Sequence, residues 1–136
     1  MTARGAGIDL IEIARVERAL ERRPGLAERI FTRDELESAR SRARPGRHLA
    51  ARFAAKEAAL KALRLGGLRL HEVEIEGGGD GPPSLRLSGS AARIAAERGV
   101  DLDVSLTHSR EHAAAVVVVV RGGQAPRMGS GTTRGV

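Results

Sequence analysis

The chain has 136 residues, no cysteine and a net charge of +6 at pH 7. This length suits a single domain, and the lack of cysteine excludes disulfides and thiolate metal sites. The longest apolar run, Ala113–Val120, is too short to cross a bilayer as a helix, and residues 1–10 lack the apolar segment of a signal peptide. We therefore expect a soluble, cytoplasmic protein without a membrane partner.

The first predicted strand, Gly7–Ile13, carries a carboxylate on its apolar face. Alternation along a strand places Asp9 on the side of Ile11 and Ile13 and opposite to Ile8. A helix at 14–23 follows. Three arginines of this helix are spaced three and then four residues apart and therefore share one face. They are Arg15, Arg18 and Arg22.

Capping and turn signals predict the remaining elements and an α+β domain over residues 1–121. Thr32 and Glu35 form a capping box at the start of a helix that runs to about Ala43. The last strand is apolar on both faces and should be central. Residues 122–136 are expected to be a disordered tail. The other predicted elements are a helix at 47–65, strands at 72–76 and 84–87, a helix at 90–98, and strands at 101–107 and 113–121.

The helix at 47–65 contains the stretch RFAAKEAALKAL. The whole chain has 23 basic residues, and its only two lysines both lie in this stretch. On a wheel of about 100° per residue, Lys56 falls within the apolar stripe and Glu57 falls beside Phe53. In one interpretation, the long side chains of Lys56 and Glu57 reach water from the edge of the stripe, and Glu57 pairs with Lys61 at i, i+4. Alternatively, Glu57 is a partly buried carboxylate that needs a cation. Lysine is a compact donor with a tunable pKa, which suits phosphate binding or proton transfer.

Two further residues extend this second interpretation. Asp9 can bond to nearby backbone, or it can join Glu57 in a Mg²⁺ site, since Mg²⁺ prefers oxygen ligands. His108 lies in the segment SLTHS at a strand end. It can bind a phosphate, act as an acid or base, or have a structural role.

Four motifs occur in a characteristic order: GIDLIEI, FTxxELE, RFAAKEAxxKAL and SLTHS. Over residues 5–121 the chain thereby resembles the holo-[acyl-carrier-protein] synthases, the small class of 4′-phosphopantetheinyl transferases. The resemblance implies an antiparallel sheet packed with helices, and a homotrimer with active sites between subunits. It also implies transfer of the phosphopantetheine arm of coenzyme A to a serine of an acyl carrier protein, with Mg²⁺ as cofactor and adenosine 3′,5′-bisphosphate as leaving group.

The resemblance also assigns roles at matching positions. Asp9 and Glu57 would hold Mg²⁺, and Lys61 would lie near the reacting phosphate. The arginines of the first helix would dock the acidic carrier protein. The residues expected to contact the coenzyme are Arg52, Lys56, Lys61, Gly66, His108 and Ser109. The chain departs from the family pattern at Gly66-Gly67, at Thr107, and at Pro82, where a lysine is usual, which affects the expected coenzyme contacts but not the metal pair.

Two other functions fit the composition less well. A basic nucleic-acid-binding module would offer stacking aromatics, but the chain has no Trp or Tyr and no helix-turn-helix or zinc-finger spacing. A catalytically inactive scaffold that binds carrier protein would not need Asp9, Glu57 and Lys61 together. The resemblance implies an acyl carrier protein and coenzyme A as partners, and nucleic acid is not expected as one.

Overall fold

The computed structural model describes residues 3–67, 69–78 and 81–122 and has the predicted α+β class. The tail predicted at 122–136 lies outside the described residues except for Gly122. No helix in the described ranges is long and apolar enough to cross a membrane. The elements are β1 (Ala3–Glu12), α1 (Ile13–Arg22), α2 (Leu26–Ile30), α3 (Arg33–Arg40), α4 (Pro45–Leu63), the 3-10 turn η1 (Leu70–Glu72), β2 (Val73–Glu76), β3 (Ser84–Leu87), α5 (Gly89–Arg98), β4 (Val100–His108) and β5 (His112–Arg121).

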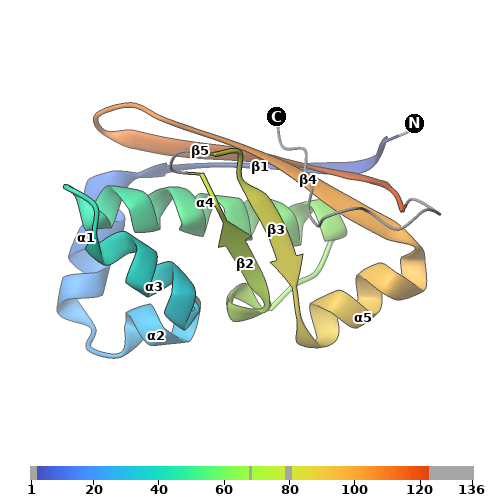
Figure 1. Cartoon of the computed structure of the whole chain (residues 1–136), viewed down its shortest axis with the longest axis horizontal. Helices are drawn as coiled ribbons and strands as arrows, with labels where there is room; N and C mark the ends of the chain where they lie inside the picture. Colours follow the sequence, from blue (N-terminus) through green and yellow to red (C-terminus); the bar gives the residue numbers. More distant parts are fainter. Residues whose placement is uncertain (1–2, 68, 79–80, 123–136) are drawn as a thin grey trace.

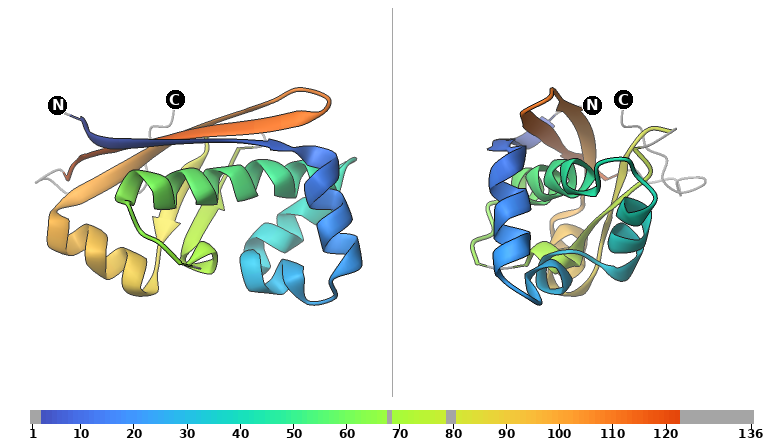
Figure 2. Two further views of the ribbon diagram at one scale, coloured as in Figure 1. Left: turned by 180° about the vertical axis from the view of Figure 1, so that it is seen from behind. Right: turned by 90° about the vertical axis from the view of Figure 1, so that its left-hand side faces the viewer.

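Helix α4 is the centre of the fold and runs beneath a three-stranded antiparallel sheet (Figure 1). The strand order is β1-β5-β4, so β5 is central, as its apolar sequence predicts. Strands β2 and β3 form a separate antiparallel pair. The end-on view in Figure 2 shows α4 enclosed by the sheet, by α1 and by the β2–β3 pair.

Small residues allow this close packing. A Cβ on Gly7 of β1 would lie 2.0 Å from the carbonyl oxygen of Ala58, so only glycine permits the strand to approach α4 this closely. The prediction of a single apolar stripe on this helix is wrong, because alanines are buried on the side opposite to the leucines, so that buried residues occupy most of the circumference. The buried alanines of α4 are Ala50, Ala51, Ala54, Ala55, Ala58, Ala59 and Ala62.

Several boundaries differ from the predicted ones. β1 begins at Ala3 instead of Gly7, because its pairing with β5 continues through a stretch without apolar alternation. α4 begins at Pro45, a residue suited to the first helical turn, and ends at Leu63 before a left-handed Arg64. α3 ends at Arg40, short of the predicted residue 43. The five-residue α2 was not predicted, since it follows the Pro-Gly pair at 24–25 directly.

The sheet has two different faces. Its inner face packs on α4, whereas its outer face is turned away from the helices (Figure 1). On this outer face Ile8 is 67% exposed, Leu10 is 68% exposed and Val116 is 37% exposed. Ile8 and Val116 are directly paired across β1 and β5, so the three side chains form one apolar patch.

Candidate functional site

Asp9, Glu57 and Lys61 come together where β1 crosses α4. The Lys61 ammonium donates hydrogen bonds to Asp9 Oδ1 at 2.9 Å and to the Ile8 carbonyl oxygen at 3.0 Å. Burial raises the pKa of Glu57, and the nearby charge of Asp9 raises it further, while Lys61 lowers it. The structure therefore brings these three groups together. Lys61 forms its ion pair with Asp9, and the alternative i, i+4 pair with Glu57 is not among the ion pairs of the described residues.

Both carboxylates line a largely apolar pocket of about 470 Å³, which we call the apolar pocket. Apolar residues from β1, α1, α2 and α4 form most of its wall, and Arg15 also lines it. The other lining residues are Leu10, Ile11, Glu12, Val16, Ala19, Leu20, Leu26, Ile30, Phe31 and Phe53.

The carboxylate pair fits a Mg²⁺ ion. The described residues contain no cluster of three or more metal-binding side chains, but Mg²⁺ is commonly held by one or two carboxylates together with waters and substrate phosphates. Burial is the main cause of the raised pKa of Glu57, and repulsion from the Asp9 carboxylate adds to it. A divalent cation between Asp9 and Glu57 would relieve that repulsion.

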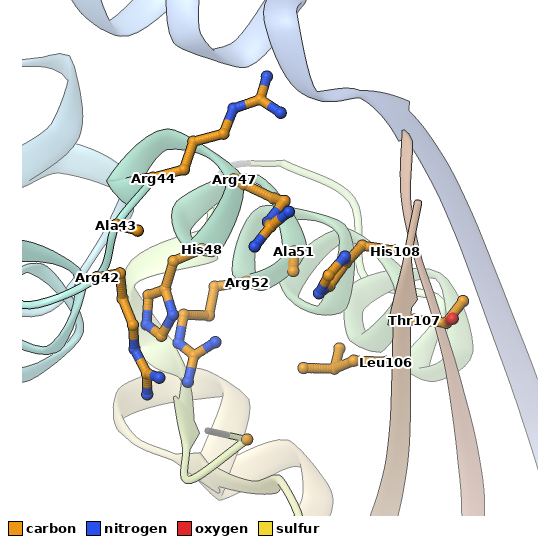
Figure 3. A pocket seen from close by; sticks show the side chains of 11 residues that line it. Arg42, Ala43, Arg44, Arg47, His48, Ala51, Arg52, Leu106, Thr107 and His108 are labelled. Atoms are coloured by element: carbon orange, nitrogen blue, oxygen red, sulfur yellow. The ribbon is translucent and has the colours of Figure 1, made fainter. Parts of the chain in front are cut away.

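A second pocket, the basic pocket, has a volume of about 560 Å³ and lies between the start of α4 and the end of β4 (Figure 3). Figure 3 shows Arg42, His48 and Arg52 side by side, with His108 extending from β4 across the pocket. Among the described residues its lining contains no carboxylate. It consists of Arg42, Ala43, Arg44, Arg47, His48, Ala51, Arg52, Gly78, Leu106, Thr107 and His108.

Arg52 is the deepest cation of the basic pocket. It is only 3% exposed, and its guanidinium donates to the Gly77 carbonyl oxygen. Its Nε has no hydrogen-bond partner within the described part of the chain. Burial lowers the pKa of Arg52 to about 10, although the charge of Glu35 acts in the opposite direction. A buried cation with an unsatisfied donor favours an incoming anion.

His48 was not predicted as a site residue. Its Nε2 lies 3.3 Å from the Ser38 hydroxyl. Burial, together with the charges of Arg52 and Arg42, lowers the pKa of His48 to about 4, so the imidazole is neutral at pH 7. The sequence also gave no signal for Arg42, Arg44 and Arg47. Arg44 bonds both carboxylate oxygens of Glu17 at 3.1 and 3.0 Å and thereby joins α1 to the start of α4.

Lys56 lies away from both pockets. It is 0% exposed, so the interpretation that its side chain reaches water from the stripe edge is wrong. Its ammonium lies 2.8 Å from Glu35 Oε1 and donates to the carbonyl oxygens of Leu70 at 3.0 Å and Val73 at 2.6 Å. These three partners use its three donors, and the structure therefore gives no support to a coenzyme contact by Lys56.

The remaining predicted residues lie near the surface. Gly66 is exposed after α4, and its carbonyl oxygen accepts a hydrogen bond from Arg69 at 3.1 Å. The Ser109 hydroxyl accepts from the His112 backbone N–H at 3.1 Å and so organises the β4–β5 turn. The three predicted docking arginines are all exposed on α1, and they are Arg15, Arg18 and Arg22.

The two pockets share no residue. Glu57 lies about 140° around the helix axis from Arg52, as the spacing of about 100° per residue requires. His108 on β4 is separated from Asp9 on β1 by the intervening β5, which places the two strand backbones about 10 Å apart. One chain therefore presents the carboxylates and the basic pocket on different sides of α4.

Known proteins are similar to this chain in sequence and in structure. The family model of the 4′-phosphopantetheinyl transferase superfamily matches residues 5–117. The chain is 47% identical to holo-[acyl-carrier-protein] synthase of Moorella thermoacetica over 117 residues, which cover 84% of this chain and 91% of the relative. It is 48% identical to the Streptomyces avermitilis protein of the same name over 120 residues, covering 87% and 98%.

Solved structures agree with this relationship. The crystal structure of holo-[acyl-carrier-protein] synthase from Neisseria meningitidis matches with a TM-score of 0.80 and 26% identity, covering 88% of this chain and 100% of that one. The Chronobacterium ammoniagenes ACPS–CoA complex matches with a TM-score of 0.76 and 28% identity, covering 88% and 98%. The chain belongs to the 4′-phosphopantetheinyl transferase superfamily.

Proposed function

We propose that the protein is a holo-[acyl-carrier-protein] synthase. It transfers the 4′-phosphopantetheine arm of coenzyme A to a serine of an apo acyl carrier protein and releases adenosine 3′,5′-bisphosphate. The proposal rests on one observation: the chain contains two complementary sets of groups. One set is a cationic pocket around the buried Arg52, and the other is the Asp9, Glu57 and Lys61 cluster.

The basic pocket receives the phosphates of coenzyme A. Arg52 lines this pocket with a guanidinium that is not fully hydrogen-bonded within the described residues, and His108 lines it from β4. Arg42 and Arg47 add charge at the same pocket, although neither was predicted from the sequence. Planar guanidinium groups match phosphate geometry and remain charged at every relevant pH, which suits them to this role.

Asp9 and Glu57 hold Mg²⁺ in the proposed enzyme. When bound, the ion neutralises negative charge on the pyrophosphate. Lys61 lies 2.9 Å from Asp9 Oδ1, and its side chain is 54% exposed, so its ammonium can also reach a phosphate oxygen beside the carboxylates. Positioning and charge neutralisation of this kind account for most catalysis of phosphoryl transfer.

The reaction replaces one P–O bond by another. The carrier serine oxygen bonds to the phosphorus next to the pantetheine arm, and the bond from that phosphorus to the bridging pyrophosphate oxygen breaks. The serine proton passes to Glu57 or to a water molecule beside it.

The active enzyme is a homotrimer in which the basic pocket of one subunit meets the carboxylate cluster of another. Two observations support this proposal. The pockets lie apart in one chain, and the exposed apolar patch of Ile8, Leu10 and Val116 needs a partner surface. Ile8 and Leu10 flank Asp9 on β1 but project from the opposite face, so the patch and the carboxylate occupy the same strand segment.

The carrier protein docks on α1. Arg15, Arg18 and Arg22 form an exposed basic row beside the apolar pocket, and Arg15 lines that pocket. An acidic carrier helix on this row would bring its serine to Asp9 and Glu57. Contacts between exposed charges of this kind mainly accelerate encounter and weaken at high salt.

Mass spectrometry tests the proposal directly. With coenzyme A and Mg²⁺, the protein should add one phosphopantetheine group to an apo acyl carrier protein. Asp9→Asn and Glu57→Gln should each abolish the transfer, whereas Glu97→Gln, an exposed change on α5, should leave it intact. Full activity of both carboxylate variants would refute the metal assignment, and an unmodified carrier protein with the parent enzyme would refute the proposed function.

A further inference from the structure

Glu35 and Lys56 form a buried ion pair that the proposed reaction does not use. Glu35 is 2% exposed and Lys56 is 0% exposed, and Glu35 Oε1 lies 2.8 Å from the ammonium. The same oxygen accepts the Thr32 backbone N–H at 2.9 Å, which is the capping-box bond. Glu35 therefore makes an ion pair with Lys56 in addition to its capping-box hydrogen bond.

The other carboxylate oxygen of Glu35 links α3 to the β2–β3 pair. Oε2 accepts the Ile75 backbone N–H at 2.7 Å. The Lys56 ammonium donates to Val73, two residues earlier on the same strand, so both members of the ion pair bond to the backbone of β2. Through these bonds β2 is tied to α3 and to α4 at once.

Arg52 depends on the segment that follows this strand. Its guanidinium donates to the carbonyl oxygen of Gly77, immediately after β2, and Arg52 lies one helical turn before Lys56 on α4. The charge of Glu35 also favours the ionised form of Arg52. Glu35 thus acts on Arg52 by two routes, through the position of β2 and through its charge.

We infer that Glu35 is a positioning residue for coenzyme binding, because through Lys56 and the backbone of β2 it holds the Arg52 guanidinium at the floor of the basic pocket. Well-packed apolar side chains of similar volume are often as stabilising as a buried ion pair, but they make no hydrogen bonds to the backbone. Apolar side chains would leave the backbone groups of Val73 and Ile75 without these partners. The inference rests on the proposed assignment of the basic pocket to coenzyme A.

The test compares Glu35→Gln with Glu37→Gln, the same change at an exposed site on the same helix. In either orientation the amide NH2 of Glu35→Gln would face other donors, either the Lys56 ammonium and the Thr32 N–H or the Ile75 N–H. We expect the KM for coenzyme A to rise roughly tenfold with a smaller change in kcat, because a misplaced cation weakens ground-state binding. Mn²⁺ affinity at Asp9 and Glu57, measured by electron paramagnetic resonance, should be unchanged, as should every parameter of Glu37→Gln.

A second variant covers the case in which Glu35→Gln does not fold. The double variant Glu35→Leu/Lys56→Met removes both charges while roughly preserving volume, and it should fold but show the same rise in KM. A folded variant of either kind with the parent KM would overturn the inference. An equal loss of Mn²⁺ affinity would also overturn it, because that result indicates general loosening of α4.

Arg52→Gln separates this inference from the proposed function. If Arg52→Gln weakens coenzyme binding and Glu35→Gln does not, only the positioning role fails. If Arg52→Gln leaves the KM for coenzyme A unchanged, the assignment of the basic pocket fails, and the positioning role fails with it.

Discussion

The two sides of helix α4 carry opposite chemistry. On one side, Glu57 meets Asp9 of β1 at the edge of an apolar pocket. On the other side, Arg52 lies at the floor of a pocket lined by arginine and histidine. Phosphoryl transfer needs both kinds of group at one substrate, because a metal-binding carboxylate pair cannot by itself hold a polyanionic coenzyme. Because the carboxylate cluster and the basic pocket lie on different sides of α4, a single chain is expected to be only part of the active unit.

The strongest test of the acidic side is Lys61→Arg. The variant keeps the charge but replaces a compact ammonium by a wider guanidinium, which cannot bond Asp9 and the Ile8 carbonyl oxygen in the same way. We expect kcat to fall by roughly 10²-fold, in line with the loss of one preorganised donor to a developing charge. Because the side chain is half exposed, the thermal midpoint of unfolding should change little. A variant with parent kcat would show that lysine is not specifically required at this position.

Ile8→Asp tests whether the two sides belong to different subunits. A carboxylate in the apolar patch opposes its burial against another subunit, so the variant should sediment as a single subunit. Transfer activity should fall with the loss of assembly, although Asp9 and Arg52 are intact. Ile8→Val is the matched control and should assemble normally. A monomeric variant with full activity would show that one chain contains a whole site.

Charge reversal on α1 tests the docking surface beside the apolar pocket. Arg18→Glu and Arg22→Glu should each raise the KM for the carrier protein several-fold at low salt, and the difference from the parent should shrink as salt is added. The KM for coenzyme A should not change, because neither residue lines the basic pocket. Arg93→Glu on α5 provides a control for the change in net charge. Loss of coenzyme binding in the α1 variants would contradict the separation of the two sides.

The smallest expected effect concerns His48 on the basic side. Its pKa in the folded protein is about 4, below the ordinary 6.5. The folded state therefore disfavours the protonated ring, so this contribution to stability is present above pH 6.5 and is lost as the pH falls towards 4. The thermal midpoint should fall further between pH 7 and pH 5 in the parent than in His48→Gln.

Coenzyme A sharpens this prediction. Its phosphates beside His48 should raise the pKa of the imidazole, which NMR titration would detect as a shift of the ring resonances. Free adenosine 3′,5′-bisphosphate is a suitable second ligand, because it carries phosphate but no pantetheine arm. An unchanged titration of His48 in the presence of both ligands would place their phosphates elsewhere.

The sequence predicted the elements well but not how completely α4 is enclosed. Alternation and turn residues were sufficient for β2 to β5, and the capping box marked the start of α3. A helical wheel, however, assumes one buried stripe. Buried residues occupy most of the circumference of α4, and Lys56 lies inside the protein instead of extending to its surface. Neighbouring residues along the chain cannot reveal the partners in α3, η1 and β2 that bury it.

The two candidate pockets were unequally predictable. Asp9, Glu57 and Lys61 lie within two contiguous motifs, and the structure brings these three residues together. The basic pocket combines residues from 42–52, 78 and 106–108, which meet only because β4 folds back beside the start of α4. His48 and Arg42 carried no motif of their own. The second bond of Glu35, to Ile75, joins positions forty apart in the chain and has no local signal.

Subunit complementation tests the shared active site most directly. Glu57→Gln supplies an intact basic pocket, and Arg52→Gln supplies an intact carboxylate cluster. Each protein alone should be nearly inactive. After co-refolding in equal amounts, activity should recover to about one quarter of the parent value, because random assembly around a closed ring joins the two intact halves in that fraction of sites. If the mixture is no more active than the two separate variants, the carboxylates and the basic pocket do not form one site across a subunit interface.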